Sequence, residues 1–539
     1  MILKSHPVLS CAEAKQGEAN LLKDEAAEWT AMQQAGAAIA RSLLNDFKEI
    51  GGLPDNARLL VLAGKGHNGG DALLAAKEIL AQYPHTTADI VLCFGEAALR
   101  PLARCSLDAL REMFGGDAAP SPRSAATTAP RAARLQFLDA KNLSESTTYD
   151  LCLDGIFGFQ FHPPLTAATA ELIAQVNIHP QIKFRAAVDL PSGLGENNAA
   201  TVFRADFTYA TGMVKSPVIT EANAAHIGRL RYLDLGFFEV GGALVAPRCA
   251  ASAPPTCHPG DAFDRILLPS ILRPLAQLRP AQTDKRTYGH LFVLGGSRHY
   301  PGAVLMTVQA ALRSGVGLLT AFVPESLVPE YAARFPEAMW VGLPQISTGG
   351  ISSSGVPWFL EKLPRATALV IGPGLGAEAE TLAAVQTIVR QTDNIPLLLD
   401  ADALRPEVLE AARSKPFIGT PHAGEFKRIA SDVPLRDFCR QRCAVVVQKG
   451  PLTRISDGEA VYHSPFGGPV LARGGSGDLL AGLIGGLLAQ KPDDLLLAAA
   501  RGVVWHGLAA DLLARDRGQV AVQTTQLLDY LPQALREAL

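Results

Sequence analysis

Short, uninterrupted apolar runs alternate with helix-like patterns along most of this sequence, and this alternation constrains the fold more than any other feature. The runs span residues 59–62, 90–94, 151–153 and 186–188 in the first half, and 291–294, 318–323, 369–371, 397–399 and 445–447 in the second. Continuous apolar residues indicate strands that are buried on both faces, as in a parallel sheet covered by helices on each side. We therefore predict an α/β protein with two three-layer domains.

Two segments have a composition that is unlike that of a folded core. Residues 115–134 are rich in Ala, Pro, Ser, Thr and Arg, which predicts a flexible insertion within a domain, because apolar runs continue on both sides. Residues 241–260 have the Pro/Ala composition of a linker, and the motif content changes there. We expect the 539 residues to form domains 1–240 and 261–539.

The charge balance excludes some classes of function. The chain has 49 Lys and Arg against 52 Asp and Glu, so its net charge is −3. This argues against binding nucleic acid or an anionic membrane by bulk electrostatics. The longest apolar run, 479–489, is shorter than the roughly 20 residues that cross a bilayer. The eight cysteines include no CxxC pair, which is typical of reduced thiols, and we expect a cytoplasmic protein.

A glycine-rich turn follows the run at 59–62 and leads into a helical pattern. It reads Gly64-Lys65-Gly66-His67-Asn68-Gly69-Gly70-Asp71, and N–H groups at such a helix start can bind a phosphate. Two other apolar runs end in Asp154 and Asp189, and Ser192 follows the second. Because the carboxyl ends of parallel strands line the ligand crevice of an open sheet, we expect these groups to share one cleft. Each alone is also compatible with a tight turn or a helix cap.

Together with Val188-Asp189-x-Pro191-Ser192-Gly193, this turn resembles the NAD(P)H-hydrate epimerase family over roughly residues 10–237. The resemblance implies a Rossmann-like, doubly wound sheet, with Asp189 contacting the nicotinamide ring and handling the proton in epimerisation. It also implies a K⁺ ion held by Asn68, Asp154 and Ser192. The implied substrate-binding residues are His67, Asn68, Gly69, Gly70, Asp71, Gly158, Phe159, Gln160, Phe161, His162, Pro163, Pro164 and Asp189. His67 and the loop 158–164 depart from the family pattern, which usually has Asn and a Gly-Thr-Gly run.

The strongest local motif of the second half is Gly474-Gly475-Ser476-Gly477-Asp478, which precedes a helical stretch rich in small residues. N–H groups at a helix start can stabilise a transferred phosphate, while Asp478 can accept the proton of an attacking hydroxyl. The alternative is a glycine-rich helix start that Asp478 merely caps. Further loops that follow predicted strands are 372–376, 420–425 and 448–453.

In this order the motifs resemble the ADP/ATP-dependent NAD(P)H-hydrate dehydratase family, a branch of the ribokinase-like fold, over roughly residues 262–539. The resemblance implies that Asp478 is the catalytic base and that Mg²⁺ accompanies ADP or ATP. The residues that it implies for contact with the hydrated dinucleotide are Ala303, Gly374, His422 and Asp478. Those that it implies for the adenine nucleotide are Lys449, Gly450, Pro451, Leu452, Thr453 and Gly477.

The order of the two halves resembles the fused bacterial repair enzyme. We therefore expect a homo-oligomeric, bifunctional enzyme that interconverts the R and S hydrates of NADH and NADPH (NADHX and NADPHX). It would dehydrate the S epimer back to NAD(P)H at the expense of ADP or ATP. Two alternatives remain. One is a ribokinase-like kinase of small alcohols fused to a nucleotide-binding module. The other is a dehydratase with a non-catalytic N-terminal domain, which His67 and the altered loop 158–164 would permit.

Overall fold

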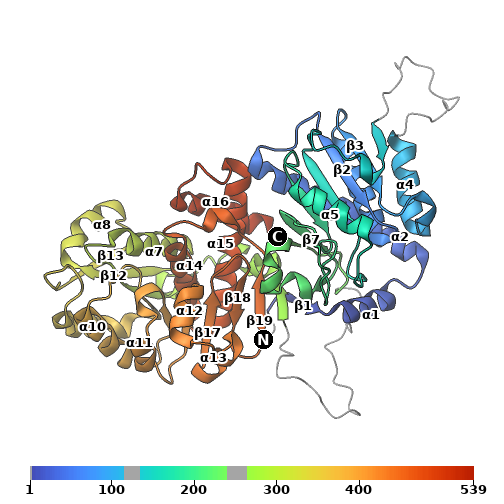
Figure 1. Ribbon diagram of the computed structural model, residues 1–539. Coiled ribbons are helices and arrows are strands. Elements are labelled where there is room, and N and C mark those ends of the chain that lie inside the picture. The colour runs from blue at the N-terminus through green and yellow to red at the C-terminus, as the bar shows by residue number, and fades with distance from the viewer. Residues whose placement is uncertain (1–2, 115–133, 239–263, 539) are drawn as a thin grey trace, which may run out of the picture. The chain divides into compact units, whose positions relative to one another are not determined.

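The computed structural model describes residues 3–114, 134–238 and 264–538 (Figure 1). Residues 115–133 of the predicted insertion and the whole predicted linker, 241–260, lie outside the described residues. The described residues form two compact units, one containing residues 7–114 and 134–238 and the other containing residues 3–6 and 264–538. The predicted boundary falls in the stretch that is not described and stays a prediction.

A sheet of seven parallel strands forms the centre of the N-terminal unit. Its strands lie in the order β4 (Leu135–Leu138), β3 (Thr87–Leu92), β2 (Arg58–Ala63), β5 (Leu151–Gly155), β6 (Arg185–Val188), β7 (Phe207–Thr211) and β9 (Arg229–Leu233). The order reverses between β2 and β5, because β3 and β4 lie on one side of β2 and the later strands lie on the other. This reversal is the hallmark of a doubly wound sheet, and the predicted Rossmann-like architecture is confirmed.

Helices cover both faces of this sheet (Figure 1). The core on one face includes α2 (Glu25–Phe47), α3 (His67–Gln82) and α4 (Pro101–Phe114), and the core on the other includes α5 (Ala167–Ile178). Strand β2 shows why its apolar run is unbroken. Leu59 and Val61 belong to the first core, whereas Leu60 and Leu62 belong to the second. Side chains that alternate between two buried faces leave no position for a polar residue.

The described part of the N-terminal unit also contains shorter elements. They include α1 (Cys11–Leu21), α6 (Ala224–Ile227) and β8 (Val214–Lys215). Strand β1 (Ser5–Leu9) runs parallel to β8, with Val8 opposite Val214 and Leu9 opposite Lys215. The preceding residues belong to the other unit, in which Leu3 is buried in the core and Arg265 donates a hydrogen bond to the Ser5 hydroxyl.

The C-terminal unit contains a longer, mostly parallel sheet. Its strands lie in the order β13 (Met339–Leu343), β12 (Leu318–Pro324), β11 (His290–Leu294), β14 (Ala368–Ile371), β15 (Leu397–Leu399), β16 (Phe417–Gly419), β17 (Ala444–Gln448), β18 (Thr453–Ser456), β19 (Val461–Ser464) and β10 (Asp264–Leu267). Only β18 runs antiparallel to its neighbours within this described set. All five apolar runs predicted in this half coincide with strands.

Helices again form a layer on each side of the sheet, so the predicted three-layer arrangement is confirmed. One core contains side chains of α7 (Pro301–Arg313), α8 (Val328–Arg334), α14 (Ser476–Gln490), α15 (Leu495–Arg517) and α16 (Leu527–Glu537). The other contains side chains of α9 (Val356–Lys362), α10 (Ala379–Arg390), α11 (Pro406–Ala411), α12 (Ala423–Ala430) and α13 (Leu435–Arg442).

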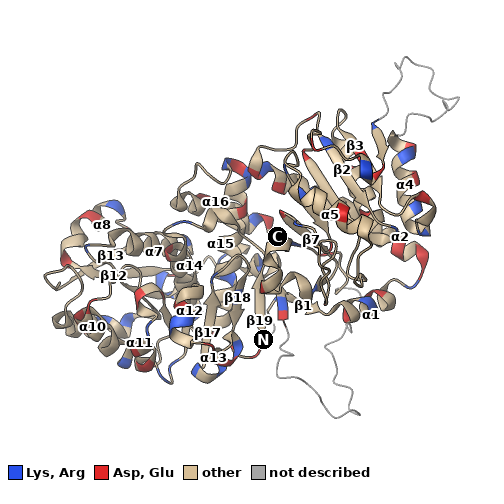
Figure 2. Cartoon of the chain, viewed as in Figure 1, with Lys and Arg blue, Asp and Glu red and all other residues tan. Residues whose placement is uncertain are grey.

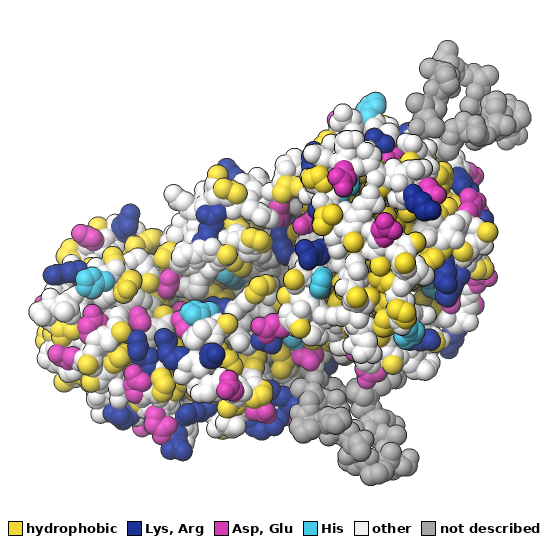
Figure 3. Space-filling model, viewed as in Figure 1, with side chains coloured by type: hydrophobic (Ala, Val, Ile, Leu, Met, Phe, Trp, Pro, Cys, Tyr) yellow, Lys and Arg dark blue, Asp and Glu magenta, His cyan; other side chains and the backbone are white. Residues whose placement is uncertain are grey.

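Charged residues lie mainly on helices and loops, whereas most strand residues are uncharged (Figure 2). On the face shown in Figure 3, basic and acidic side chains are intermingled. Among the described residues, α15 is the one helix whose length and composition would allow it to cross a membrane, and 72% of its most apolar stretch is buried inside the fold.

Candidate active sites

The glycine-rich turn of the N-terminal unit lies where the strand order reverses. Strand β2 leads into this turn, and the N–H of Gly64 donates a hydrogen bond to the carbonyl oxygen of Gly155 at 3.0 Å. A Cβ atom on Gly64 would lie 1.9 Å from the carbonyl oxygen of Ile156, so only glycine permits this approach of the two strand ends. The crevice at such a point is where ligands of open α/β sheets bind.

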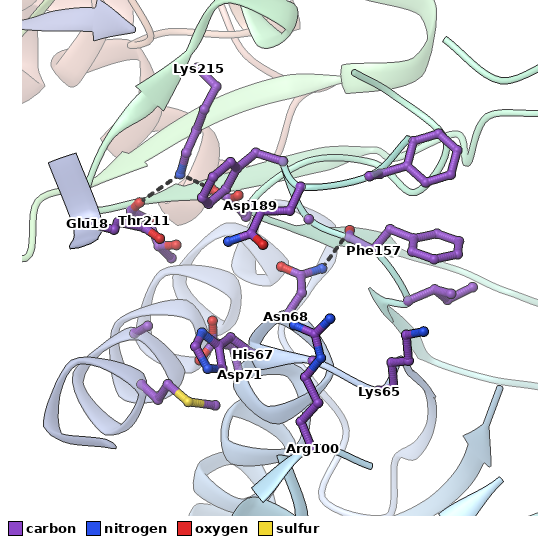
Figure 4. Close-up of a pocket in the computed structure, with 18 of the residues that line it drawn as sticks. Glu18, Lys65, His67, Asn68, Asp71, Arg100, Phe157, Asp189, Thr211 and Lys215 are labelled. Atoms are coloured by element: carbon purple, nitrogen blue, oxygen red, sulfur yellow. Dashed lines mark hydrogen bonds and ion pairs between the residues drawn. The ribbon is translucent and has the colours of Figure 1, made fainter. Parts of the chain in front are cut away.

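A cavity of about 530 Å³ opens at this crevice (Figure 4). The predicted substrate-binding residues that line it are His67, Asn68, Asp71, Gly158, Phe159, Gln160, Phe161, His162, Pro164 and Asp189. Three predicted residues, Gly69, Gly70 and Pro163, are not part of the lining. Gly69 and Gly70 are buried in the first turn of α3, where a Cβ atom would collide with the Gly64 carbonyl oxygen or with Met32. These two glycines allow the turn to pack tightly.

Asp189 forms a buried ion pair in the wall of the cavity. The Nζ atom of Lys215 lies 2.6 Å from Oδ1 of Asp189, and the two side chains are only 1% and 6% exposed. Lys215 also donates to the carbonyl oxygen of Thr211 at 3.3 Å, and its ammonium lies 4.8 Å from the centre of the Phe159 ring. The φ angle of Asp189 is 64°, a conformation that non-glycine residues adopt rarely and mostly where the surrounding structure demands it.

Two further carboxyl groups line the same cavity. Burial, reinforced by Asp189 and Glu18, raises the pKa of Asp71 well above its ordinary value. The Oδ1 atom of Asp71 is buried and has no hydrogen-bond partner among the described residues. Burial also raises the pKa of Glu18 to about 7, with Asp189 adding to the effect and Lys215 opposing it. The cavity therefore combines an ion-paired aspartate with two carboxyl groups whose pKa values burial raises.

The residues predicted to hold K⁺ lie together at the end of β5. Ser192 donates to Asp154 from its N–H and from its hydroxyl, at 2.7 and 2.6 Å. The Ser192 hydroxyl accepts a hydrogen bond from the N–H of Phe157, whose carbonyl oxygen accepts one from Nδ2 of Asn68. Asp154 is fully buried, and burial raises its pKa to about 6 although Ser192 opposes the shift. The set offers carboxylate, hydroxyl, carbonyl and amide oxygens, the hard ligands that suit a cation such as K⁺.

No group of three or more His, Cys, Asp or Glu residues that could hold a metal ion occurs in the described residues. The residues predicted to hold K⁺ do not form such a group, because Asp154 is the one carboxylate among them.

In the C-terminal unit, the predicted motif opens α14. Gly475 is the residue before the helix and has a φ angle of 92°, in the left-handed region that favours glycine. Asp478 lies in the first turn. Burial raises the pKa of Asp478 to about 7, with Asp400 adding to the effect and Lys449 opposing it. A carboxyl group that titrates near neutrality is well suited to accepting a proton from a substrate.

Lys449 joins the predicted nucleotide loop to this helix start. Its Nζ atom lies 3.1 Å from Oδ1 of Asp400 and 3.9 Å from Oε2 of Glu425. A Cβ atom on Gly477 would lie 3.2 Å from the same Nζ atom, so the structure brings Lys449 and Gly477 together. Burial disfavours the charged form of Lys449, but Asp400, Glu425 and Asp478 outweigh this effect and raise its pKa.

The rest of the predicted nucleotide loop forms the turn between β17 and β18. The Thr453 hydroxyl donates to the carbonyl oxygen of Gly450 at 3.3 Å, and Pro451 and Leu452 lie between them in the chain. Gly450 and Pro451 are exposed. The loop therefore presents backbone to solvent directly beside Lys449.

The predicted dinucleotide-contacting residues come from four different elements. The hydroxyl of Thr307 contacts the carbonyl oxygens of Ala303 in α7 and Asp478 in α14, at 3.2 and 3.1 Å. A Cβ atom on Gly374 would lie 3.1 Å from Cβ of Ala303. Ala303, Gly374 and Asp478 are thus brought together by the packing of α7 against α14 and the loop after β14.

His422 is also the N-cap residue of α12. Its Nδ1 atom accepts hydrogen bonds from the N–H groups of Gly424 and Glu425, and Glu425 accepts one from the His422 N–H in return. The His422 side chain is 60% exposed, which leaves its Nε2 edge accessible beside the Glu425 carboxylate.

Sequence reasoning missed Asp400 and Glu18. Asp400 directly follows the apolar run 397–399, so the sequence marks it by the same strand-end position as Asp154 and Asp189. Glu18 gave no such signal, because it lies on a helix before the first predicted strand of the sheet.

These two sites, one in a Rossmann-like sheet and one in a second, mostly parallel sheet covered by helices on both sides, are typical of a bifunctional α/β enzyme. Residues 29–216 match the family described as YjeF-related protein N-terminus, and residues 291–533 match the family described as NAD(P)H-hydrate dehydratase. The chain is 35% identical to the bifunctional NAD(P)H-hydrate repair enzyme Nnr of Gloeobacter violaceus over 97% of each chain. It is 32% identical to that of Moorella thermoacetica, over 94% of this chain and 92% of the relative. The chain belongs to the family of bifunctional NAD(P)H-hydrate repair enzymes, with an epimerase and a dehydratase domain.

Among solved structures, the chain is similar to the ADP/ATP-dependent NAD(P)H-hydrate dehydratase from Bacillus subtilis co-crystallized with ATP/Mg²⁺. The identity is 30%, the match covers 50% of this chain and 96% of that one, and the TM-score is 0.42. The family membership favours the predicted bifunctional enzyme over a kinase of small alcohols.

Proposed function

We propose that Asp189 serves epimerisation of hydrated NAD(P)H at C6 and that Asp478 serves dehydration of the S epimer. One observation carries the proposal. In each unit, the aspartate expected to handle protons lies near a lysine and a glycine-rich helix start, with Lys215 beside Asp189 and Lys449 near Asp478. This is the combination that phosphate-bearing substrates and proton transfer both require.

The dehydration follows from the chemistry of the substrate. The C6 hydroxyl of the hydrated ring leaves poorly as hydroxide, so it is first converted to a phosphate ester. Asp478 accepts the hydroxyl proton while the oxygen attacks the terminal phosphorus of ADP or ATP, and the shortened nucleotide leaves. The lone pair of the ring nitrogen then expels phosphate, and loss of a proton from C5 restores the double bond of NAD(P)H.

The nucleotide would bind at the start of α14 and at the turn after β17. Lys449 would neutralise its phosphates, and the backbone of Gly450, Pro451, Leu452, Thr453 and Gly477 would contact it, as their placement around Lys449 supports. Mg²⁺ bound with the nucleotide would offset phosphate charge, and the carboxylates of Asp400 and Glu425, which lie beside Lys449, would offer it oxygen atoms. We favour ADP as the phosphate donor, because the fused arrangement resembles the bacterial enzymes.

In the N-terminal unit the dinucleotide would lie in the cavity with its nicotinamide at Asp189 and a phosphate at the start of α3. Asn68, Asp154 and Ser192 would hold K⁺, whose charge would support that phosphate. Their hydrogen-bonded cluster and its oxygen-rich composition support this role. His67 and the loop Gly158–Pro164 line the same cavity, with the exception of Pro163, and would shape the pocket around the substrate.

We further propose a cytoplasmic homo-oligomer whose partners are NADHX, NADPHX and adenine nucleotides. The net charge of −3 and the intermingled surface charges of Figure 3 support small-molecule partners over nucleic acid or membrane.

The decisive experiment supplies separated R and S hydrates of NADH together with ADP or ATP and follows the return of reduced-nicotinamide absorbance. We expect both epimers to be consumed faster than they interconvert without enzyme. Asp478→Asn should abolish the return of absorbance and leave epimerisation intact. Retained dehydration by Asp478→Asn would remove Asp478 as the base. If the R epimer is consumed only at the rate of its uncatalysed conversion to the S epimer, the N-terminal unit is not an epimerase.

A further inference from the structure

Glu18 lies in α1, before the first residue that matches either family, and the mechanism above leaves it without a role. It lines the same cavity as Asp189 and Lys215 (Figure 4). We propose that Glu18 is a second proton-transferring residue of the epimerase site, which acts on the C6 oxygen together with Asp189. This inference rests on the proposed epimerase function.

The start of α1 is held directly beside Lys215. Strand β1 pairs with β8, so that Leu9 lies opposite Lys215, and α1 begins two residues later. Ser10 caps the helix, because its hydroxyl accepts a hydrogen bond from the N–H of Glu13, and the Glu13 carboxylate accepts one from the Ser10 N–H. Such a capping box defines where a helix begins and in which direction it runs. The same strand that carries the lysine therefore also orients α1.

A close approach of α1 to the turn before β8 then sets the position of Glu18. Gly17 is buried, and a Cβ atom on it would lie only 3.0 Å from Cε of Met213. Because Gly17 has no side chain, the Met213 side chain packs directly against α1 at this point. The next residue, Glu18, lines the cavity together with Thr211 and Lys215. Figure 4 shows Glu18, Thr211 and the Lys215–Asp189 pair in this part of the wall.

The Glu18 carboxyl is free to meet a ligand. Asp189 is bound by Lys215, whereas the Glu18 side chain makes no hydrogen bond within the described part of the chain. The charged groups that face Glu18 are Lys215 from β8, Asp189 after β6, Glu28 from α2 and Asp71 from α3. Burial raises its pKa to about 7, and the two carboxylates Asp189 and Glu28 add to the shift that Lys215 opposes.

The Asp189 and Glu18 carboxyl groups of this cavity have different surroundings, because Asp189 is ion-paired with Lys215 and Glu18 has no such partner among the described residues. Such a difference in environment is typical of a base paired with an acid. Epimerisation needs such a pair. Glu18 donates a proton to the C6 hydroxyl, the C6–O bond breaks as the ring-nitrogen lone pair forms a C6=N1 double bond, and water leaves. A water molecule then adds to the other face of C6, its electrons displace the double bond back to nitrogen, and Asp189 takes the released proton. The reverse reaction exchanges the two roles, so atoms and charge balance in both directions.

The test measures epimerisation by itself. The full-length protein is mixed with one purified epimer of NADHX without ADP or ATP, and the ratio of epimers is followed by chromatography from pH 6 to pH 9. We expect Glu18→Gln to reduce the enzymatic rate about 100-fold, the lower end for loss of a general acid or base. Glu18→Asp should recover part of the rate. The wild-type rate should fall above about pH 7, and this decline should be absent in Glu18→Gln.

Glu171→Gln is the matched control, because Glu171 is exposed on α5 and does not line the cavity. Dehydration of the S epimer with ADP, measured on the same preparations, reports on the integrity of the other unit. A wild-type enzyme that does not accelerate epimerisation would refute the proposed function itself. An active wild type with an equally active Glu18→Gln variant would overturn only the role of Glu18. Equal losses in Glu18→Gln and Glu18→Asp, with an unchanged pH profile, would mean that Glu18 is merely structural.

Discussion

Lys449, at the end of β17, and Asp400, at the end of β15, form an ion pair across the C-terminal sheet, with Nζ 3.1 Å from Oδ1. Strand β16 lies between these two strands, so the pair links two loops that are not adjacent in the sheet. Asp400 also raises the pKa of Asp478. The pair therefore holds the lysine expected to bind phosphate and tunes the carboxylate expected to act as the base.

The pH dependence of dehydration follows from the pKa of Asp478, which burial raises to about 7. A base must be deprotonated to work, so activity should rise with pH through about 7 and level off above it. At one pH unit below the pKa about a tenth of the molecules carry the charged form, so the rate at pH 6 should be about tenfold below the plateau. Rates of NADH recovery from the S epimer at saturating ADP would check this. A rate that stays constant from pH 6 to pH 8 would contradict it.

Asp400→Asn should shift the rise of the dehydration rate with pH to a lower pH. The substitution removes a negative charge that raises the pKa of Asp478, so Asp478 should lose its proton at a lower pH. It also removes the charged partner of Lys449, and the KM for ADP should increase. The pH profile and the KM of the variant are the measurements. Asp437→Asn is the control and should change neither, because Asp437 lies on α13 with a half-exposed side chain that pairs with Arg440. If the dehydration rate of Asp400→Asn rises at the same pH as that of the wild type, Asp400 does not affect the pKa of Asp478.

Lys215→Met should destabilise the N-terminal unit and abolish epimerisation. The substitution leaves Asp189 buried without its cation, and breaking a buried ion pair in this way typically costs about 3–5 kcal/mol. Lys183→Met is a matched control, because the Lys183–Asp150 pair involves a lysine whose side chain is 54% exposed, and such pairs contribute about 1 kcal/mol or less. Denaturant unfolding and the nucleotide-free epimerisation assay measure both effects. Equal free energies of unfolding for Lys215→Met and Lys183→Met would argue against a buried ion pair between Lys215 and Asp189.

Gly482→Ala should loosen the packing of α14 on α7. A Cβ atom at this position would lie 2.2 Å from the carbonyl oxygen of Thr307, the residue that joins Ala303 to Asp478. Overpacking of this kind costs about 1–3 kcal/mol, and a displaced α14 should also lower the rate of dehydration. Gly302→Ala is the control, since nothing lies within 4 Å of the added methyl group, and it should leave stability unchanged or slightly raised. Thermal unfolding and the dehydration rate would detect the difference.

Much of the fold was predictable because a strand that is buried on both faces is apolar at successive positions. Strand β2 is an example, since its side chains alternate between two cores. The resulting apolar pattern can be seen in the sequence of the strand itself. Strands β18 and β19 were not predicted. Thr453 and Arg454 of β18 are only partly buried, and a strand with polar residues does not stand out from a loop. The motifs at strand ends were also predictable, because each one comes directly after an apolar strand in the sequence.

The sequence by itself determined two doubly covered α/β sheets, their glycine-rich turns and the carboxylates that follow strands, because periodicity and turn chemistry are local properties of the chain. Only the tertiary structure decided which charged groups share a site. Lys215 meets Asp189, Lys449 meets Asp400 and Glu18 reaches the cavity of Asp189 through contacts between distant segments. The protonation of these groups depends on burial and on neighbouring charges, and both come into existence only when the chain has folded.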